Sequence, residues 1–483
     1  MEKWIIIGSV LIVASILSSK LVYKFGIPVL LLFLAMGMFV GVDGPLHVDF
    51  EDAHLTESIC SIALTVIMFY GGFGVNLKEA KRVAAPSILL STVGVLVTAG
   101  ITGIFTHWIL GWSMIDSMLL GAVVSSTDAA SVFSVLRSRK LSLKEGAASL
   151  LEIESGSNDP MSYMLTFLLH EIAQGIKYSP KDVALFFVKQ FAFAVIIGVG
   201  IALVTVFLLK RINLEMDGLY SIFVLAMLFL CFSINQRLGG NGYLAVYLMG
   251  IILGNGHFAH RRSILHFFDG LSWLVQIGLF FILGLLSTPK QLVTHLGAAL
   301  LCTLVLIVIA RPIATAAIMT PFKFKLRTQV LVSWCGLRGA ASIVFSTLLL
   351  ADNLPISNTL FNIVFVVCLL SITLQGTFLP NIARKLHMVD STQSIFKTFN
   401  DYPEESSGRL AEVEVTAKHP WAGKAIMDAD IPESILVVMI HRDGKVVTPK
   451  GSTVMLAGDT VVLSGSNLEE LERVAKGEEF ETI

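Results

Sequence analysis

The chain has 483 residues, of which 54% are hydrophobic and 15% are charged, and its formal net charge is −1. Soluble domains carry about 25% charged residues, whereas about 20 consecutive apolar residues span a bilayer as a helix, and runs of that length recur here. The composition therefore predicts a polytopic membrane protein. The near-zero net charge argues against a nucleic-acid partner.

Residues 1–387 are expected to form an all-α transmembrane domain. The five cysteines of the chain lie in its apolar runs, which favours core packing over a disulfide framework or a zinc site. The apolar segments predict about thirteen membrane-spanning helices, over residues 3–24, 27–46, 56–76, 84–110, 114–137, 147–172, 182–209, 218–237, 241–257, 262–287, 290–320, 326–351 and 357–384.

Basic residues alternate between the loops on the two sides of these spans. One set of loops holds about sixteen Lys and Arg residues and the other about four. The positive-inside rule places the rich set in the cytoplasm. The expected protein is therefore a multi-pass protein of the plasma or inner membrane, with its N-terminus outside and everything after residue 385 or so inside.

The composition changes after the last span. Residues 388–408 are polar and indicate a linker, and residues 409–475 alternate short β-rich runs with two helical segments. Two of those runs surround Asp443–Gly444, a strong hairpin signal. We expect a small cytoplasmic α+β domain, whose size favours pairing with a second copy.

Two acidic residues are expected at the same depth in neighbouring spans. Asp128 lies about fourteen residues into the fifth span, roughly 21 Å, and Asp159 about twelve residues into the sixth, roughly 18 Å. An ionisable residue at such depth is a functional-site hypothesis by default. Two carboxylates without His or Cys neighbours suit a small cation that prefers oxygen ligands, and they also suit protons.

The spacing on the sixth span adds polar neighbours to Asp159. Ser155 and Asp159 are four residues apart and share a helix face, as do Glu154 and Asn158 on the adjoining face. Pro160 lacks an N–H, so the carbonyl of Gly156 loses its helical partner and becomes available as an oxygen ligand. The hydroxyl-rich run before Asp128, which includes Thr127, favours an unwound stretch around a cavity.

Two arginines are expected inside the membrane. Arg338 lies between Gly336 and Gly339, and Arg311 precedes Pro312. A buried guanidinium needs an anion, and we expect Glu154 to pair with Arg338 in a structural role, with Arg311 also structural. The interruptions of the fifth and twelfth spans fit corresponding positions of an inverted repeat. The alternative for Asp128 and Asp159 is a structural role, capping half-helices or pairing with an arginine.

The motifs "STDAASVFSVLR", "LEIESGSNDP" and "GLRGAAS" resemble those of the first family of cation:proton antiporters, with the closest likeness to NhaP-type and CvrA-like potassium/proton antiporters. The C-terminal domain resembles the RCK C-terminal (TrkA-C) module. The resemblance implies a dimer, an ion site at Thr127, Asp128, Ser155 and Asp159, and support from Glu154, Asn158 and Arg338. Asn158 is linked in the family to electroneutral exchange.

The leading hypothesis is a secondary antiporter that exchanges K⁺, or else Na⁺, for protons, with a cyclic dinucleotide or nucleotide as the regulatory ligand implied by the resemblance. The alternatives are an RCK-regulated cation channel or a Na⁺-selective antiporter. A channel needs a carbonyl filter, and no TVGYG-like loop is present. No nucleophile or cofactor motif favours an enzyme.

Overall fold

A computed structural model describes residues 29–390 and 409–465, together with residue 13 and apart from residues 49, 51, 140, 259, 353, 417–418, 430, 433 and 443–444. The chain divides into two compact units, Met1–Asn400 and Asp401–Ile483. Each unit has its own buried apolar core.

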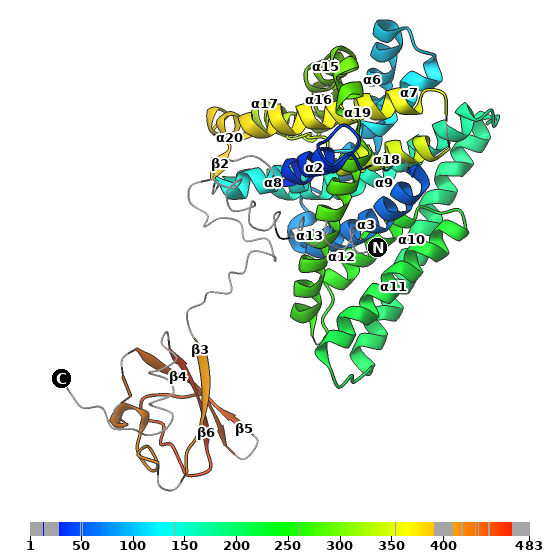
Figure 1. Cartoon of the computed structure of the whole chain (residues 1–483). Coiled ribbons are helices and arrows are strands. Elements are labelled where there is room, and N and C mark those ends of the chain that lie inside the picture. Colours follow the sequence, from blue (N-terminus) through cyan, green and yellow to red (C-terminus); the bar gives the residue numbers. More distant parts are fainter. Residues whose placement is uncertain are drawn as a thin grey trace. The chain divides into compact units, whose positions relative to one another are not determined.

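The first unit is a bundle of helices (Figure 1). Its helices are α2 (Val29–Val40), α3 (Ala53–Gly74), α4 (Leu77–Ala80), α5 (Ala84–Leu89), α6 (Val95–Leu110), α7 (Met114–Val123), α8 (Ala129–Ser138), α9 (Ala147–Ala173), α10 (Pro180–Arg211), α11 (Asp217–Arg237), α12 (Gly242–Gly254), α13 (Arg261–Leu286), α14 (Pro289–Thr294), α15 (Leu296–Val305), α16 (Arg311–Met319), α17 (Leu326–Trp334), α18 (Ala340–Ala351), α19 (Ser357–Leu370) and α20 (Gly376–Lys385). Short π-helical turns continue three of the spans, at η1 (Leu90–Gly94), η2 (Leu306–Ala310) and η3 (Ser371–Gln375).

The first predicted span, residues 3–24, lies almost wholly outside the described residues. The helices match the predicted spans that follow it. Seven helices in the described part of the chain are long and apolar enough to cross a membrane, and shorter apolar helices accompany them. The predicted eleventh span begins later than expected, because α14 is a separate short helix. All five cysteines are buried, in agreement with a packing role.

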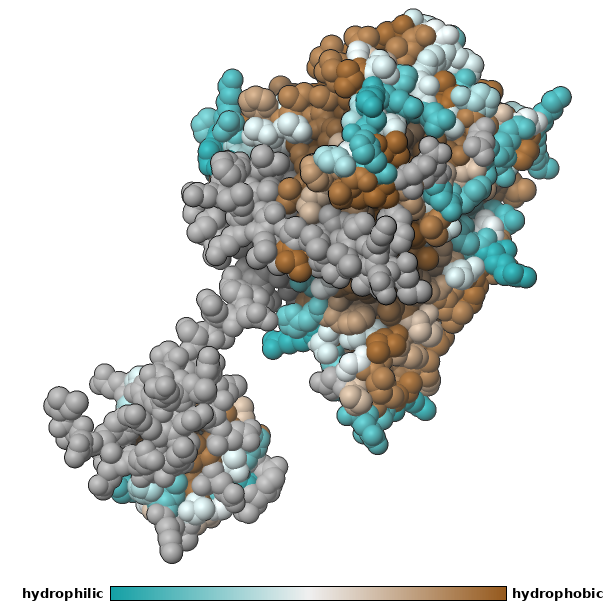
Figure 2. Space-filling model, in the orientation of Figure 1, coloured by the Kyte–Doolittle hydropathy of each residue, from teal (hydrophilic) through white to brown (hydrophobic). Residues whose placement is uncertain are grey.

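Apolar side chains cover much of the surface visible around α10 and α11 (Figure 2). Exposed apolar residues include Leu185, Val188 and Ile196 on α10 and Leu219 and Ile222 on α11. In a soluble protein such a surface would be a liability, but in a bilayer the lipid tails cover it. The surface therefore agrees with a membrane-embedded unit.

The fifth and twelfth spans are each interrupted, as the sequence predicts. The chain leaves the helical path between α7 and α8 over residues 124–128 and between α17 and α18 over residues 335–339. The two breaks touch, since the backbone N–H of Asp128 donates to the carbonyl of Leu337 at 2.8 Å. Each break thereby satisfies backbone groups that lipid would leave without partners.

The second unit is a four-stranded antiparallel sheet in the order β3-β6-β4-β5, formed by β3 (Arg409–Glu414), β4 (Ile435–Arg442), β5 (Lys445–Val447) and β6 (Thr460–Gly465). The pairing of Arg442 with Lys445 confirms the predicted hairpin, whose two turn residues lie outside the described residues. Where the sequence predicts two helical segments, the described residues contain a short 3-10 turn, Ile426–Asp428. Residues 466–475 of the expected domain lie outside the described residues.

The stretch interpreted as a linker begins with a strand of the first unit. β2 (Val389–Asp390) pairs antiparallel with β1 (Ser142–Leu143), which lies in the loop between α8 and α9. Residues 389–390 are therefore part of the membrane unit rather than free linker.

Close packing of α3 on α12 depends on glycine. A Cβ at Gly250 would lie 2.3 Å from the carbonyl oxygen of Phe69, a backbone atom. We expect Gly250→Ala to destabilise the protein by about 1–3 kcal/mol, as overpacking generally does, and to lower the thermal unfolding temperature in detergent. The matched control is Gly270→Ala on α13, where a Cβ meets nothing within 4 Å. Equal unfolding temperatures for the two variants would contradict this account of the α3–α12 contact.

Candidate cation-binding site

Asp159 lies in the middle of α9, facing the break between α7 and α8. Its side chain is 9% exposed. The hydroxyl of Ser126, in the break, donates a hydrogen bond to Oδ1 of Asp159. An ionised carboxylate accepts at about four lone-pair sites, so this one hydroxyl leaves most of its acceptor capacity to an ion or a proton.

Two further residues of α9 bind the backbone of the break. Oγ of Ser155 donates to the carbonyl of Thr127 at 2.7 Å and accepts from the N–H of Ala129 at 2.8 Å. The Asn158 amide donates through Nδ2 to the Thr127 hydroxyl, and its Oδ1 accepts from the Thr127 N–H at 3.4 Å. Ser155 and Asn158 thus hold the unwound residues against α9.

Asp128 ends the break and begins α8. It is the N-cap residue of α8, and its carboxylate accepts from the N–H of Ser131 at 3.3 Å and from the Ser131 hydroxyl at 2.6 Å. A Cβ at Gly339 would lie 2.4 Å from an oxygen of this carboxylate, so the close approach requires glycine there. Asp128 therefore has local partners that Asp159 lacks, as the alternative structural reading expected.

Arg338 lies in the second break and reaches the first. Its Nη1 donates to the carbonyls of Ser125 at 2.7 Å and Ser126 at 2.8 Å. These carbonyls lie just beyond the C-terminal end of α7, where the helix dipole is negative. The guanidinium, which is 2% exposed, therefore uses backbone dipoles as its counter-charge.

The expected pairing of Glu154 with Arg338 is wrong. Glu154 forms a salt bridge with Arg311, and the two side chains are 1% and 4% exposed. The π-helical turn η2 ends immediately before Arg311. Gly336 leaves room for the arginine, because a Cβ there would lie 2.6 Å from its Nε. Arg311 therefore takes the place beside Glu154, and Arg338 turns to the carbonyls of the break.

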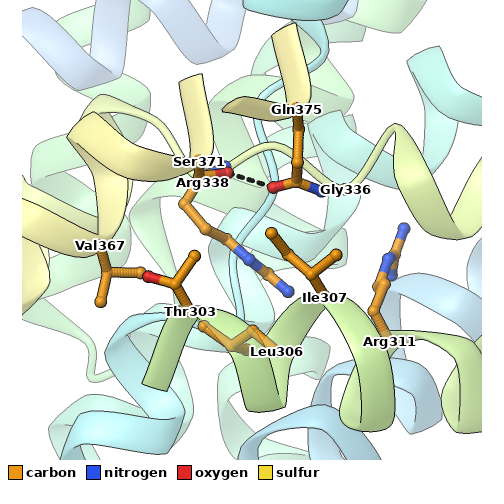
Figure 3. A pocket seen from close by; sticks show the side chains of 9 residues that line it. All are labelled: Thr303, Leu306, Ile307, Arg311, Gly336, Arg338, Val367, Ser371 and Gln375. Atoms are coloured by element: carbon orange, nitrogen blue, oxygen red, sulfur yellow. Dashed lines mark hydrogen bonds between the residues drawn. The ribbon is translucent and has the colours of Figure 1, made fainter. Parts of the chain in front are cut away.

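Both arginines line one small cavity (Figure 3). Ser371 accepts from the backbone N–H of Arg338 at 2.9 Å and donates to Gln375. These two residues belong to η3, so a second π-helical turn positions the break that carries Arg338. π-Helical turns are frequent at functional sites.

The structure thus brings all the predicted residues together around the two breaks. It adds two residues that the sequence analysis did not single out, Ser126 at Asp159 and Ser131 at Asp128. The sequence offered a signal for each. Ser126 belongs to the hydroxyl-rich run, and Asp128 with Ser131 three residues later is the spacing of an N-cap.

Two interrupted helices that cross beside a buried carboxylate define the broken-helix class of secondary transporters. The family model described as "Sodium/hydrogen exchanger, transmembrane" matches residues 9–385, and the chain belongs to this family. The model of the TrkA-C domain matches residues 410–475.

The chain is similar to proteins named as antiporters over nearly its whole length. It is 34% identical over 482 residues to the K(+)/H(+) antiporter NhaP2 of Shewanella sp. (strain ANA-3), which covers 98% of this chain and 83% of that protein. It is 35% identical over 462 residues to the K(+)/H(+) antiporter NhaP of Alkalimonas amylolytica, and the match covers 95% of this chain and 80% of that protein. The solved structure of the sodium proton antiporter MjNhaP1 from Methanocaldococcus jannaschii shares the fold, with a TM-score of 0.70 and 23% identity. The match covers 80% of this chain and 99% of that chain.

The new pairing makes a prediction about stability. Glu154→Gln or Arg311→Gln leaves one buried charge without its partner, which costs about 3–5 kcal/mol, whereas the double variant removes both charges and costs less than the sum. Thermal unfolding of the two single variants and the double variant measures this coupling. The matched control pairs Glu154→Gln with Arg338→Gln, for which we expect a smaller coupling, because Arg338 binds the carbonyls of Ser125 and Ser126. Additive losses for Glu154 with Arg311 would contradict the assignment.

Proposed function

We propose that this protein is a secondary antiporter that exchanges a monovalent cation, K⁺ rather than Na⁺, for protons by alternating access. The observation that supports this best is Asp159, a buried carboxylate at mid-helix with one hydroxyl donor, opposite an unwound stretch rich in oxygen atoms. Such a group takes up either a proton or a cation with oxygen ligands. The two compete for one site, and that competition couples their movements.

The roles of the site residues follow from their partners. Asp159 is the shared carrier, and Asp128, Thr127 and Ser155 contribute oxygen atoms near it. Asn158 binds the unwound residues between α7 and α8, and Arg338 donates hydrogen bonds to their carbonyls. The salt bridge between Glu154 and Arg311 fixes α9 to α16.

The charges around the breaks favour electroneutral exchange. Three carboxylates (Asp128, Asp159 and Glu154) and two guanidinium groups (Arg311 and Arg338) leave one net negative charge when all are ionised. One proton or one monovalent cation neutralises it. Because a buried net charge is costly, the site favours one bound positive charge in both directions of transport.

Potassium is favoured by the names of the similar proteins, while the ligands themselves suit either ion. Hydroxyl, carbonyl and carboxylate oxygens bind K⁺ and Na⁺ alike, so a Na⁺-selective antiporter is the second candidate. Comparing K⁺, Na⁺ and Rb⁺ in proton-coupled flux assays with proteoliposomes decides between them.

The proposal includes the organisation of the protein in the membrane. Residues 1–387, extended by the strand β2 to residue 390, form the transport domain of a homodimer in the plasma or inner membrane, with the N-terminus outside. Residues 409–475 form a cytoplasmic regulatory domain that binds a small ligand, with a cyclic dinucleotide or nucleotide as the candidate. The TrkA-C match supports the regulatory assignment.

Asp159→Asn is expected to abolish exchange. The substitution keeps the size of the side chain and its capacity to accept from Ser126, but the amide has no charge to pass between proton and cation. Proton-coupled K⁺ flux in proteoliposomes should fall to that of protein-free vesicles. The matched control is Asp116→Asn, at the start of α7, where the carboxylate accepts from the hydroxyl of the N-cap residue Ser113 at 2.6 Å. Near-normal exchange by folded Asp159→Asn protein would refute the carrier assignment.

Asp128→Asn is expected to weaken cation binding without uncoupling exchange. Asparagine caps a helix about as well as aspartate, so α8 should be retained and the change isolates the charge. We expect the apparent KM for K⁺ to rise about tenfold, which corresponds to about 1.4 kcal/mol. An unchanged KM and pH profile would remove Asp128 from the site and leave it as the cap of α8.

A further inference from the structure

The segment that leaves the last helix is bound to the loop between the two helices that flank the ion site. After α20, β2 pairs with β1, and the N–H of Lys144 donates to the carbonyl of Met388 at 2.9 Å. Met388 is fully buried, and Leu143 is 4% exposed. This contact is therefore built as part of the apolar core, unlike a chance crossing of two loops.

A third segment is fixed at the same place. Glu145, next to Lys144, accepts from Nζ of Lys325 at 2.8 Å and from the hydroxyl of Thr328 at 2.6 Å, and it forms a salt bridge with Arg327. These hydrogen bonds, led by that from Lys325, lower the pKa of Glu145 to about 2. The Thr328 hydroxyl also lies 3.9 Å from the sulfur of Met388. We call residues 142–145, 325–328 and 388–390 the clasp.

The backbone on both sides of the clasp has unfavourable geometry. Glu145 has φ 60° and His387 has φ 56°, values that non-glycine residues rarely adopt. Such residues are unfavourable and persist where the surrounding structure holds them. The packing and hydrogen bonds of the clasp provide that stabilisation.

Two of the three segments of the clasp lead directly to the ion site. α8 runs from the clasp loop to Asp128 in ten residues, about 15 Å. α9 begins two residues after Glu145 and carries Asp159. α17 runs from Thr328 and its neighbours to the break that holds Arg338. Figure 1 shows α8, α17, α20 and β2 gathered at one end of the membrane unit.

We propose that the clasp is the route by which the C-terminal domain controls the ion site. The inference rests on the proposed function, a regulated antiporter, and names the regulatory contact. In the sequence, β2 is the last described element before β3, and it is bonded to the loop between α8, which Asp128 caps, and α9, which carries Asp159. A change in the C-terminal domain therefore shifts the balance between two arrangements of α8 and α9 through this strand pair.

The test combines deletion of the C-terminal domain with opening of the clasp. Lys144 is exposed, and Lys144→Pro removes the N–H that bonds to Met388 without altering a buried side chain. Lys144→Ala is the matched control, because it removes the same charge and keeps the N–H. Each is made in the full chain and in a chain ending at residue 400, and proton-coupled K⁺ flux is measured in proteoliposomes.

Deletion is expected to change the flux of the unsubstituted and Lys144→Ala proteins by about fivefold or more, the lower end of typical coupling between sites. In Lys144→Pro, the full and shortened chains should transport at the same rate, within about twofold. Met388→Asp, which places a charge in the buried part of the clasp, should behave like Lys144→Pro. Where flux is measured, the route is wrong if deletion has no effect on the unsubstituted protein, or if its effect survives in both clasp variants.

A second readout does not depend on transport. Hydrogen exchange of residues 124–139 should change on deletion in the unsubstituted and Lys144→Ala proteins, and should not change in Lys144→Pro. If flux is absent from every protein but this pattern of exchange is found, the proposed antiport fails and the clasp stands. If the exchange of these residues responds equally in Lys144→Pro, the clasp is refuted even where antiport is measured.

Discussion

The contact between the Arg338 guanidinium and the carbonyls of Ser125 and Ser126 is the interaction on which the candidate cation-binding site depends. An unwound stretch inside a membrane exposes backbone groups that lipid cannot bind. Arg338 satisfies the carbonyls at one end of the break, and the carbonyl of Leu337 accepts from the N–H of Asp128 at the other. The second break therefore supplies the hydrogen-bond partners that water would supply to an unwound segment in a soluble protein. As a result, the oxygen-rich residues of the first break stay unwound beside α9.

The same arrangement separates the roles of the two central carboxylates. Asp128 is bound by the N–H and hydroxyl of Ser131 at the positive end of α8, so its charge is balanced within its own helix. Asp159 is in the middle of a continuous helix, where the backbone donors are already used, and it receives the Ser126 hydroxyl from the break. A carboxylate balanced by its helix is suited to support, and one that depends on the break is suited to exchange.

The sequence predicted the features that rest on local chemistry. Clustered hydroxyls and glycines marked both interrupted helices, and helical spacing placed Ser155 beside Asp159. The sequence did not predict the partner of Glu154, because the choice between Arg311 and Arg338 depends on how η2 turns the helix and on the space beside Gly336. The sequence analysis did not predict the strand β2 for a similar reason. Two residues have no periodicity to detect, and their pairing with Ser142 and Leu143 joins segments more than 240 residues apart.

Short half-helices make the site responsive to its surroundings. In an uninterrupted span, a displaced end is absorbed over the whole helix and its side contacts. Here α8 and α17 have ten and nine residues, and each has one end at a break whose hydrogen bonds hold residues of the candidate site. We therefore expect a movement at their outer ends to reach Asp128 and Arg338 with little damping. The breaks that leave Asp159 beside unwound backbone also bring the candidate site within one short helix of the loop that pairs with β2.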